Sequence, residues 1–474
     1  MPELLTPDLC IIGAGSGGLS VAAAAAAMGI AVVLIEKGEM GGDCLNTGCV
    51  PSKALIAAAH AAHVMRGAGR FGIMTGEPRV DFAKVRSHVQ SVIAQIAPND
   101  SQARFEAMNV RVIRAAARFT GRNQCEAGGI TIKARRFVVA TGSSPVVPPI
   151  LGIDLVRALT SDSIFDLASL PPRLVIIGAG PIGIELAQAF RRLGSEVTIL
   201  DSGAALAQDD PELAEPVLRC LAQEGVVLRT NVQILRIEPR GTGVRVVLAG
   251  QRLEESIDGS HLLIATGRAP NVENLGLDLA GVAFDKTGIK VGRNLRSTNK
   301  RIYAVGDVAG GLQLTHLANY QAGLVLRATL FRLRVQQQPQ LVPRVTYSDP
   351  EIAGIGLSEA QARLQHRHIR ILRWPFAEND RACTERDTSG LIKVITARNG
   401  QILGAGITGA GAGDMIGLWV LAISKAMKIS DIAALVLPYP TRGEISRRVA
   451  ITSYAASLRS PWLGRTLRFL RWFG

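Results

Sequence analysis

Two cysteines, Cys44 and Cys49, lie five positions apart in the segment GGDCLNTGCVPSK, within a chain of 474 residues that contains six cysteines. Thiols at this spacing could bind a metal, staple the chain or form a redox-active disulfide. A zinc site normally has about four ligands at short paired spacings. Neither a second cysteine pair nor a histidine cluster accompanies this one. The sequence therefore predicts no metal site and leaves a structural or a redox-active disulfide open.

The composition is that of a globular protein. Apolar residues make up 47% of the chain, and its length suggests about three domains. The opening segment MPELLTPDLC lacks the basic and apolar regions of a signal peptide, and no apolar run reaches the roughly 18 residues that cross a bilayer. We therefore expect a cytoplasmic protein.

The net charge of +14 favours anionic partners. Aromatic residues account for only 4% of the chain, and the lysines and arginines are scattered rather than interleaved with aromatic side chains. Nucleic acid binding is therefore not predicted.

An internal repeat carries the main structural prediction. Each copy reads as an apolar strand, a Gly-x-Gly-x-x-Gly turn, a helix and a second strand that ends in an acid. Its glycines and acids are Gly13, Gly15, Gly18 and Glu36 in the first copy, and Gly178, Gly180, Gly183 and Asp201 in the second. The predicted strands span 9–12 and 31–35 in the first copy, and 174–177 and 197–200 in the second, where the helix spans 184–193. The acid follows the first glycine by 23 residues in both copies (36 − 13 and 201 − 178).

Such a repeat is typical of dinucleotide binding. Glycines let the backbone approach a pyrophosphate at the positive end of the helix, and the acid accepts a hydrogen bond from a ribose hydroxyl. Two copies thus predict two dinucleotide-binding folds. Asp201 is followed by Ser202, Gly203 and Ala204, with no arginine to accept a 2′-phosphate, so NADH is favoured over NADPH.

Together, two dinucleotide folds and a Cys-x4-Cys after the first resemble the class I pyridine nucleotide-disulfide oxidoreductases, which include dihydrolipoamide dehydrogenase, glutathione reductase and mercuric reductase. The resemblance covers roughly residues 8–455. It also rests on four further stretches, which are Ala140-Thr141-Gly142, Ala265-Thr266-Gly267-Arg268, Tyr303-Ala304-Val305-Gly306-Asp307 and PRVTYSDPEIAGIGL over 343–357.

The resemblance implies an α/β fold with two Rossmann-like domains, for FAD and NAD, and a C-terminal α+β dimerisation domain. The predicted boundaries are 1–148 and 266–340 for the FAD-binding domain, 149–265 for the NAD(P)-binding domain, 341–455 for the dimerisation domain and 456–474 for a basic tail. The resemblance also implies a homodimer, in which the C-terminal segment completes the partner's site.

The resemblance further implies that Cys44 and Cys49 form a redox-active disulfide at the start of a helix beside the flavin. Cys49 would face the flavin and Cys44 would exchange with the substrate, so that electrons pass from NADH to FAD, to the disulfide and then to the acceptor. Lys53 and Glu185 match an ion pair near the flavin, and Asp307 matches a contact to its ribityl chain. The implied FAD-binding residues are Gly13, Gly15, Gly18, Glu36, Lys53, Thr141, Gly142, Gly306 and Asp307, and the implied NAD-binding residues are Gly178, Gly180, Gly183, Asp201, Gly267 and Arg268.

The C-terminal catalytic signature departs from the family. The usual His-Pro-Thr-x-x-Glu is replaced by a segment that begins at Tyr439 and ends at Glu444. An imidazole titrates near 6.5 and shuttles protons at neutral pH, whereas a phenol titrates near 10 and is a poor base. Efficient oxidation of dihydrolipoamide is therefore not expected.

Several functions remain open. A tyrosine here resembles mercuric reductases, but their C-terminal vicinal cysteines and N-terminal CxxC domain are not found in this sequence. We expect transfer of electrons from NADH to a disulfide or thiol-reactive acceptor. The alternatives are a dihydrolipoamide dehydrogenase with an altered base, a mercuric reductase-like enzyme, and a membrane-docked electron-transfer or interaction protein.

The basic tail, RSPWLGRTLRFLRWFG over 459–474, is amphipathic as a helix. The apolar face consists of Trp462, Leu463, Leu467, Phe469, Leu470 and Phe473, and the opposite face carries Arg465, Arg468 and Arg471. Such a helix could lie on an anionic membrane surface or pack against its own dimer. The sequence therefore predicts a cytoplasmic enzyme with peripheral membrane contact as one of two roles for this segment.

Overall fold

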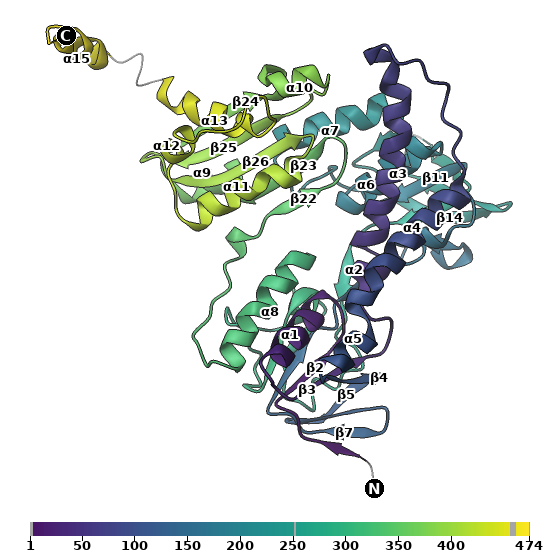
Figure 1. Cartoon of the computed structure of the whole chain (residues 1–474). Coiled ribbons are helices and arrows are strands. Elements are labelled where there is room, and N and C mark those ends of the chain that lie inside the picture. Colours follow the sequence, from purple (N-terminus) through teal and green to yellow (C-terminus); the bar gives the residue numbers. More distant parts are fainter. Residues whose placement is uncertain (1–2, 251–252, 456–460, 474) are drawn as a thin grey trace. The chain divides into compact units, whose positions relative to one another are not determined.

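The computed structural model describes residues 3–250, 253–455 and 461–473 of the chain. It divides into two compact units (Figure 1). The first comprises residues 1–202 and 228–337, and the second comprises 203–227 and 338–474. The five-part division of the chain predicted from the sequence remains a prediction.

The first unit contains a parallel five-stranded sheet in the order β21-β8-β2-β3-β4. Its strands are β2 (Leu9–Ile12), β3 (Val32–Glu36), β4 (Arg111–Arg114), β8 (Arg136–Val139) and β21 (Ile302–Ala304). Helix α1 (Ser16–Ala27) and helix α8 (Thr315–Thr329) share one apolar core with the sheet. Strand β21 and helix α8, which come much later in the sequence than β2 and α1, thus complete the first nucleotide fold.

A second parallel sheet of the first unit has the order β10-β17-β11-β12-β13. Its strands are β10 (Ala158–Leu159), β11 (Arg173–Ile177), β12 (Glu196–Leu200), β13 (Val227–Arg229) and β17 (His261–Ile264), and helix α6 (Pro181–Leu193) joins β11 to β12. An antiparallel sheet beside it consists of β14 (Ile234–Arg240), β15 (Gly243–Leu248) and β16 (Glu255–Gly259). Both strand–helix–strand repeats predicted from the sequence are therefore present.

The remaining elements of the first unit lie mostly around these sheets. They are the helices α2 (Gly42–Asn46), α3 (Cys49–Gly67), α4 (Phe82–Ile96) and α5 (Gln102–Ala107), the sheet formed by β1 (Leu4–Leu5), β7 (Ile130–Ile132), β6 (Gln124–Ala127) and β5 (Ala117–Gly121), and the pairs β9 (Ser143–Pro145) with β18 (Arg268–Pro270) and β19 (Phe284–Asp285) with β20 (Gly288–Ile289).

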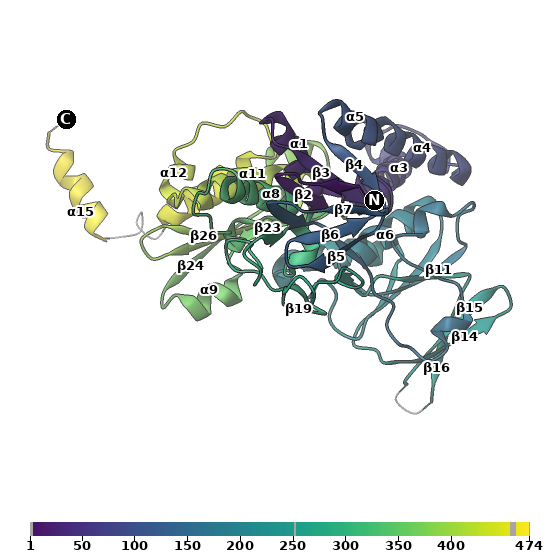
Figure 2. The same ribbon diagram turned by 90° about the horizontal axis from the view of Figure 1, so that it is seen from below.

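The second unit is built on an antiparallel sheet in the order β22-β23-β26-β25-β24. The strands are β22 (Arg344–Thr346), β23 (Glu351–Gly356), β24 (Ile369–Pro375), β25 (Leu391–Ala397) and β26 (Ile402–Gly409), and the helices are α9 (Glu359–Gln365), α10 (Asp380–Thr384), α11 (Ala412–Ser424), α12 (Ile429–Ala433) and α13 (Glu444–Ile451). The fully buried Trp419 lies in its apolar core, and Figure 2 shows the same elements from below.

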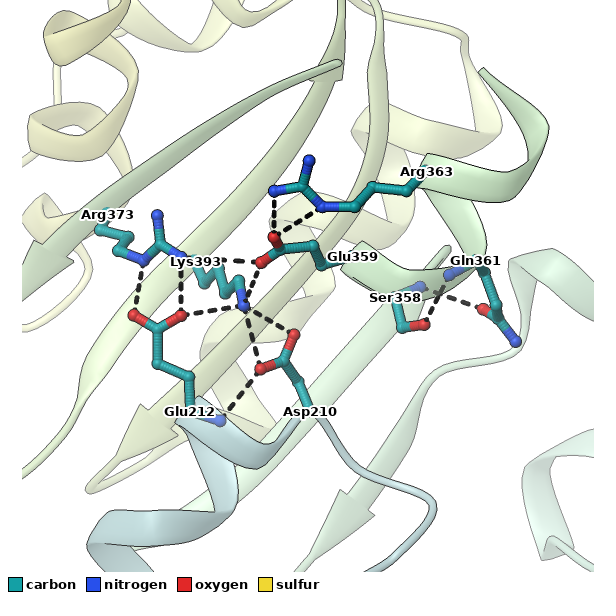
Figure 3. A network of polar contacts seen from close by, with 8 residues as sticks. All are labelled: Asp210, Glu212, Ser358, Glu359, Gln361, Arg363, Arg373 and Lys393. Carbon is teal, nitrogen blue, oxygen red and sulfur yellow. Dashed lines mark hydrogen bonds and ion pairs between the residues drawn. The ribbon is translucent and has the colours of Figure 1, made fainter. Parts of the chain in front are cut away.

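Helix α7 (Pro211–Gln223) follows β12 in sequence but belongs to the second unit. Figure 3 shows the polar network at its first turn. The side chain of Lys393 on β25 is only 4% exposed. Its ammonium lies within 3.0 Å of the carboxylates of Asp210, Glu212 and Glu359. Arg373 on β24 pairs with Glu212 at 2.5 Å. These ion pairs fasten α7 to the sheet of the second unit.

Helix α15 (Pro461–Leu470) ends the described chain. Four of its large apolar residues are at least half exposed, namely Trp462, Leu467, Phe469 and Leu470. Trp472 and Phe473, which follow the helix, are also at least half exposed. Residues 459, 460 and 474 of the predicted tail lie outside the described residues. Within the described part of the chain, no helix is both long and apolar enough to cross a membrane.

Candidate active site

The two cysteines lie on separate helices. Cys44 is within the short α2, and Cys49 is the first residue of α3. The expectation that both begin one helix is therefore corrected. The break falls at Gly48, whose backbone angles (φ −119°, ψ −109°) are not helical and whose absent Cβ would lie 2.9 Å from the carboxylate of Asp43. A glycine fits this close approach of side chain and backbone.

Both cysteines are free thiols in this structure. A hydrogen bond from Cys44 lowers the pKa of Cys49 to about 6, with further help from Thr315, whose Oγ1 lies 3.4 Å from the sulfur, and from the charge of Lys53. The same bond raises the pKa of Cys44. Because Cys49 also lies at the positive end of α3, it is the thiolate of the pair near neutral pH.

Lys53 follows Cys49 by one helical turn, so the two side chains share a face of α3. Its Nζ lies 2.7 Å from Oε2 of Glu185 on α6, and the Glu185 side chain is 7% exposed. The ion pair joins α3, the helix of Cys49, to α6, the helix of the second nucleotide fold. The implied position of this pair beside a flavin stays a prediction.

The glycine turns of the two nucleotide folds have the same backbone requirements. A Cβ at Gly13 (φ +108°) or at Gly178 (φ +113°) would lie 2.3 Å from a backbone carbonyl oxygen, so both turns require glycine. By contrast, a Cβ at Gly180 would have no atom within 4 Å, and one at Gly15 only a single atom at 4.0 Å. The space before each helix N-terminus therefore fits the pyrophosphate of a dinucleotide.

The acid at the end of each repeat also accepts a hydrogen bond from the glycine turn of that repeat. Glu36 Oε2 accepts the N–H of Ala14 at 2.6 Å, and Asp201 Oδ2 accepts the N–H of Ala179 at 2.6 Å. The predicted ribose contacts of both acids stay predictions. The equivalent bonds show that the two folds repeat in atomic detail.

Arg268 is the centre of a polar chain through the first unit. Its guanidinium donates to Ser143 Oγ at 2.8 Å and lies 3.3 Å from Asp43, the residue before Cys44. Ser143 Oγ in turn donates to Asp307 at 2.6 Å. Burial raises the pKa of Asp307, while Ser143 and the charge of Arg268 oppose this. The predicted NAD-binding Arg268 is thus held between the cysteine segment and the predicted flavin-binding Asp307.

The other predicted nucleotide-binding residues lie in turns of the same unit. Thr141 donates through Oγ1 to the carbonyl of Asn271 at 2.8 Å, and the N–H of Gly306 donates to Gln321 at 2.7 Å. A Cβ at Gly142 or Gly267 would meet no atom within 4 Å, although both have positive φ. Gly18 and Gly183 pack so closely on Gly13 and Gly178, respectively, that neither could carry a side chain.

Tyr439 and Glu444 lie in the second unit. Tyr439 is 66% exposed, and its phenol donates a hydrogen bond to Asp380 Oδ2 at 2.9 Å. Glu444 begins α13 and lies 3.9 Å from Arg448 one turn later. Sequence reasoning did not find Asp380 or Thr315, because each reaches its partner only through folding, 59 and 266 positions away.

This site combines a dithiol with two dinucleotide folds, and it defines a flavin- and nicotinamide-dependent disulfide oxidoreductase. Residues 7–322 match the pyridine nucleotide-disulphide oxidoreductase family, and residues 342–450 match the dimerisation domain of that family. The chain belongs to this family, which confirms the resemblance and the fold class predicted from the sequence. It is an FAD-dependent oxidoreductase, and its dimerisation domain supports a homodimer.

Curated relatives of this chain include two kinds of enzyme. The chain is 36% identical to a mercuric reductase from Streptomyces lividans, and 33% identical to a dihydrolipoyl dehydrogenase from Staphylococcus aureus. Each alignment covers 94% of this chain and 96% of the relative. A mercuric reductase from Lysinibacillus sphaericus is 33% identical over 94% of this chain and 82% of its own length.

A solved structure is also similar. The Cu(II) complex of the HOCl-induced flavoprotein disulfide reductase RclA from Escherichia coli matches with a TM-score of 0.85 and 27% sequence identity. The match covers 94% of this chain and 99% of that chain.

Proposed function

We propose that this enzyme passes electrons from NADH, through FAD and the Cys44–Cys49 pair, to a disulfide or thiol-reactive acceptor. The observation that carries the proposal is the unequal dithiol, in which Cys49 at the start of α3 has a pKa of about 6 and Cys44 on α2 retains its proton. When bound, FAD would supply the two-electron exchange between the nicotinamide and the dithiol. Each cysteine then has a distinct role.

Cys44 is proposed as the interchange thiol. After it loses its proton, its sulfur attacks the acceptor disulfide, forms a mixed disulfide and releases the first thiol. Cys49 then attacks Cys44, reforms the Cys44–Cys49 disulfide and releases the second thiol. The acceptor gains the two electrons that the dithiol loses. It also takes up two protons, one equivalent to the proton that Cys44 released and one from the solvent, because Cys49 is already a thiolate. Lys53 stabilises the Cys49 thiolate between these steps.

The direction of turnover is proposed from Tyr439 and Glu444. Family members that oxidise dithiols use a histidine base at the position of Tyr439, and the hydrogen bond to Asp380 raises the pKa of this phenol. Tyr439 is therefore not proposed as a base, because its single O–H is donated to Asp380. Reduction of an acceptor by NADH is favoured over oxidation of dihydrolipoamide.

A soft metal ion is the second candidate acceptor. Two free thiols in one segment suit a thiophilic ion, and several curated relatives are mercuric reductases. A panel of lipoamide, glutathione disulfide, quinones and Hg(II), with NADH as donor under anaerobic conditions, tests both candidates. Turnover of any panel member that survives in both Cys44→Ser and Cys49→Ser would exclude the dithiol from the reaction with that acceptor.

The preference for NADH is proposed from Asp201. A carboxylate at this position repels a 2′-phosphate. The structure adds Arg229, whose carbonyl accepts the N–H of Asp201 at 3.0 Å, but its guanidinium is paired with Glu255 at 2.7 Å. The nearby cation is therefore already neutralised, which favours NADH.

Peripheral membrane contact through 459–474 is proposed from the tail. Its exposed aromatic and leucine side chains suit the headgroup boundary of a bilayer, and Arg465, Arg468 and Arg471 suit anionic lipids. Co-sedimentation with vesicles that contain anionic lipid tests this role. Binding should weaken in a variant with the three arginines replaced by glutamine. Equal binding of this variant would contradict the proposal.

A further inference from the structure

A hollow in the second unit lies at one end of the edge strand β24. Its volume is about 410 Å³, and it is lined by His368, Ile369, Arg370 and Arg398. Such a volume is within the range of about 300–1,000 Å³ that small-molecule sites occupy. No acidic residue lines the hollow. Its lining residues are therefore two arginines, a histidine and an isoleucine.

The strand register explains why these side chains converge. Arg370 lies on β24, and His368 lies in the bend just before this strand. Ile369 pairs with Ala397, the last residue of β25, and Arg398 follows in the turn after it. The paired ends of the two strands thus bring these side chains to the same end of the sheet.

These cations differ from other arginines of the second unit. Arg363 and Arg381 each pair with a glutamate four positions away, and Arg373 pairs with Glu212 of α7. Within the described part of the chain, neither Arg370 nor Arg398 forms an ion pair or a side-chain hydrogen bond, and the same holds for His368. All three residues are exposed. The positive charges of Arg370 and Arg398 are left available to a ligand.

We infer that this hollow, formed by His368, Arg370 and Arg398, binds a small soluble molecule that carries phosphate groups. Two arginine guanidinium groups each match phosphate oxygens with paired hydrogen bonds. A phosphate group carries a charge of about −1.5 to −2 at neutral pH, which balances two arginines better than one carboxylate does. The site is separate from the dithiol, and the inference does not rest on the proposed function.

The test is titration calorimetry of the flavin-loaded enzyme with sodium pyrophosphate, in saturating NAD⁺ so that the nicotinamide nucleotide site is filled. We expect saturable binding that weakens with salt. The double variant Arg370→Gln/Arg398→Gln should weaken binding by about tenfold or more for each arginine. The control, Arg219→Gln/Lys425→Gln, removes the same charge from the same unit and should change the affinity by less than about twofold if direct contacts dominate. The single variants Arg370→Gln and Arg398→Gln provide the answer if the double variant does not fold.

Three results would overturn the inference. The first is no saturable binding by the wild type, in which case the charges only protect the edge strand from pairing with other chains. The second is binding of citrate as tightly as pyrophosphate, which would exclude a preference for phosphate. The third concerns phosphatidic acid vesicles and the tail variant, in which Arg465, Arg468 and Arg471 are replaced by glutamine. If this variant still binds the vesicles and loses that binding when Arg370 and Arg398 are also replaced, the hollow would be assigned to a lipid headgroup.

Discussion

Tyr439 donates its phenolic proton to Asp380, with 2.9 Å between Oη and Oδ2. The negative acceptor raises the pKa of the phenol above its ordinary value. A phenol that is harder to ionise is a still weaker base at neutral pH. The residue that stands at the family's histidine position is therefore tied to a carboxylate of its own unit.

Replacing Tyr439 by histidine should restore a base. General-base assistance contributes about 10² to 10⁴ in rate, so Tyr439→His should raise dihydrolipoamide oxidation at pH 7 by at least about tenfold. The rate of flavin reduction by NADH should not change. Steady-state and stopped-flow assays measure the two rates.

The control for this change is Tyr439→Phe, which removes the hydroxyl without adding a base and should give no increase. Wild-type dithiol oxidation should climb toward alkaline pH, as substrate thiols ionise near 8.5 without help. A wild type that is already fast at pH 7, and that is slowed by the histidine, would show that another base exists.

The pKa of Cys49 sets the pH at which the reduced enzyme is alkylated. Since the thiolate is the reactive form, iodoacetamide labelling of Cys49 should rise with pH through a midpoint near 6. Cys44→Ala removes the largest stabilising contact and should move the midpoint upward, whereas Cys44→Ser keeps a donor and should move it less. Peptide mass spectrometry measures labelling at each cysteine separately. A midpoint that stays in place in Cys44→Ala would exclude the hydrogen bond as the cause.

Lys53 should influence Cys49 through its charge. Lys53→Met removes a cation that lowers the pKa of Cys49, so the labelling midpoint should rise and the long-wavelength thiolate-to-flavin absorbance of the two-electron-reduced enzyme should fall at pH 7. Lys37→Met, which changes an exposed lysine, is the matched control. An unchanged midpoint in Lys53→Met would mean that the ion pair with Glu185 screens this charge.

Cofactor choice should respond to Glu255 as well as to Asp201. Asp201→Ala removes the repulsive carboxylate and should lower the preference for NADH, measured as the ratio of kcat/KM for the two nucleotides. Glu255→Gln frees the guanidinium of Arg229 from its 2.7 Å ion pair and should improve use of NADPH. A wild type that uses NADPH as well as NADH would overturn the proposed preference.

Among the residues of the polar network in the second unit, Lys393 should contribute most to the free energy of unfolding. Its ammonium is buried among three carboxylates, so Lys393→Met should lower the free energy of unfolding by about 3–5 kcal/mol. Arg363, whose side chain is 63% exposed, is the comparison, and Arg363→Gln should cost about 0.5 kcal/mol or less. Urea denaturation of both variants measures the difference, and equal losses would contradict this account of the network.

Local pattern was sufficient to predict the two nucleotide folds. The predicted strand 9–12 has the bounds of β2, and the strand predicted over 174–177 begins one residue earlier as β11. Apolar runs and glycine turns are short-range signals, and glycines such as Gly13 have no substitute where a carbonyl oxygen would lie 2.3 Å from Cβ. Features of this kind are present in the sequence itself.

Contacts between distant segments could not be predicted in the same way. The polar contacts that run from Asp43 through Arg268 to Asp307 bring together residues from three parts of the sequence. The placement of α7 in the second unit depends on Lys393, which is 183 positions from Asp210. Periodicity carries no information about such partners.

The chain crosses between its two units three times, after residues 202, 227 and 337. The first crossing comes one residue after Asp201, whose carboxylate accepts the N–H of Ala179 in the turn of the second nucleotide fold. A deletion that removes the second unit must therefore cut the chain next to this acid, so the first unit cannot be isolated without altering the end of its own second nucleotide repeat.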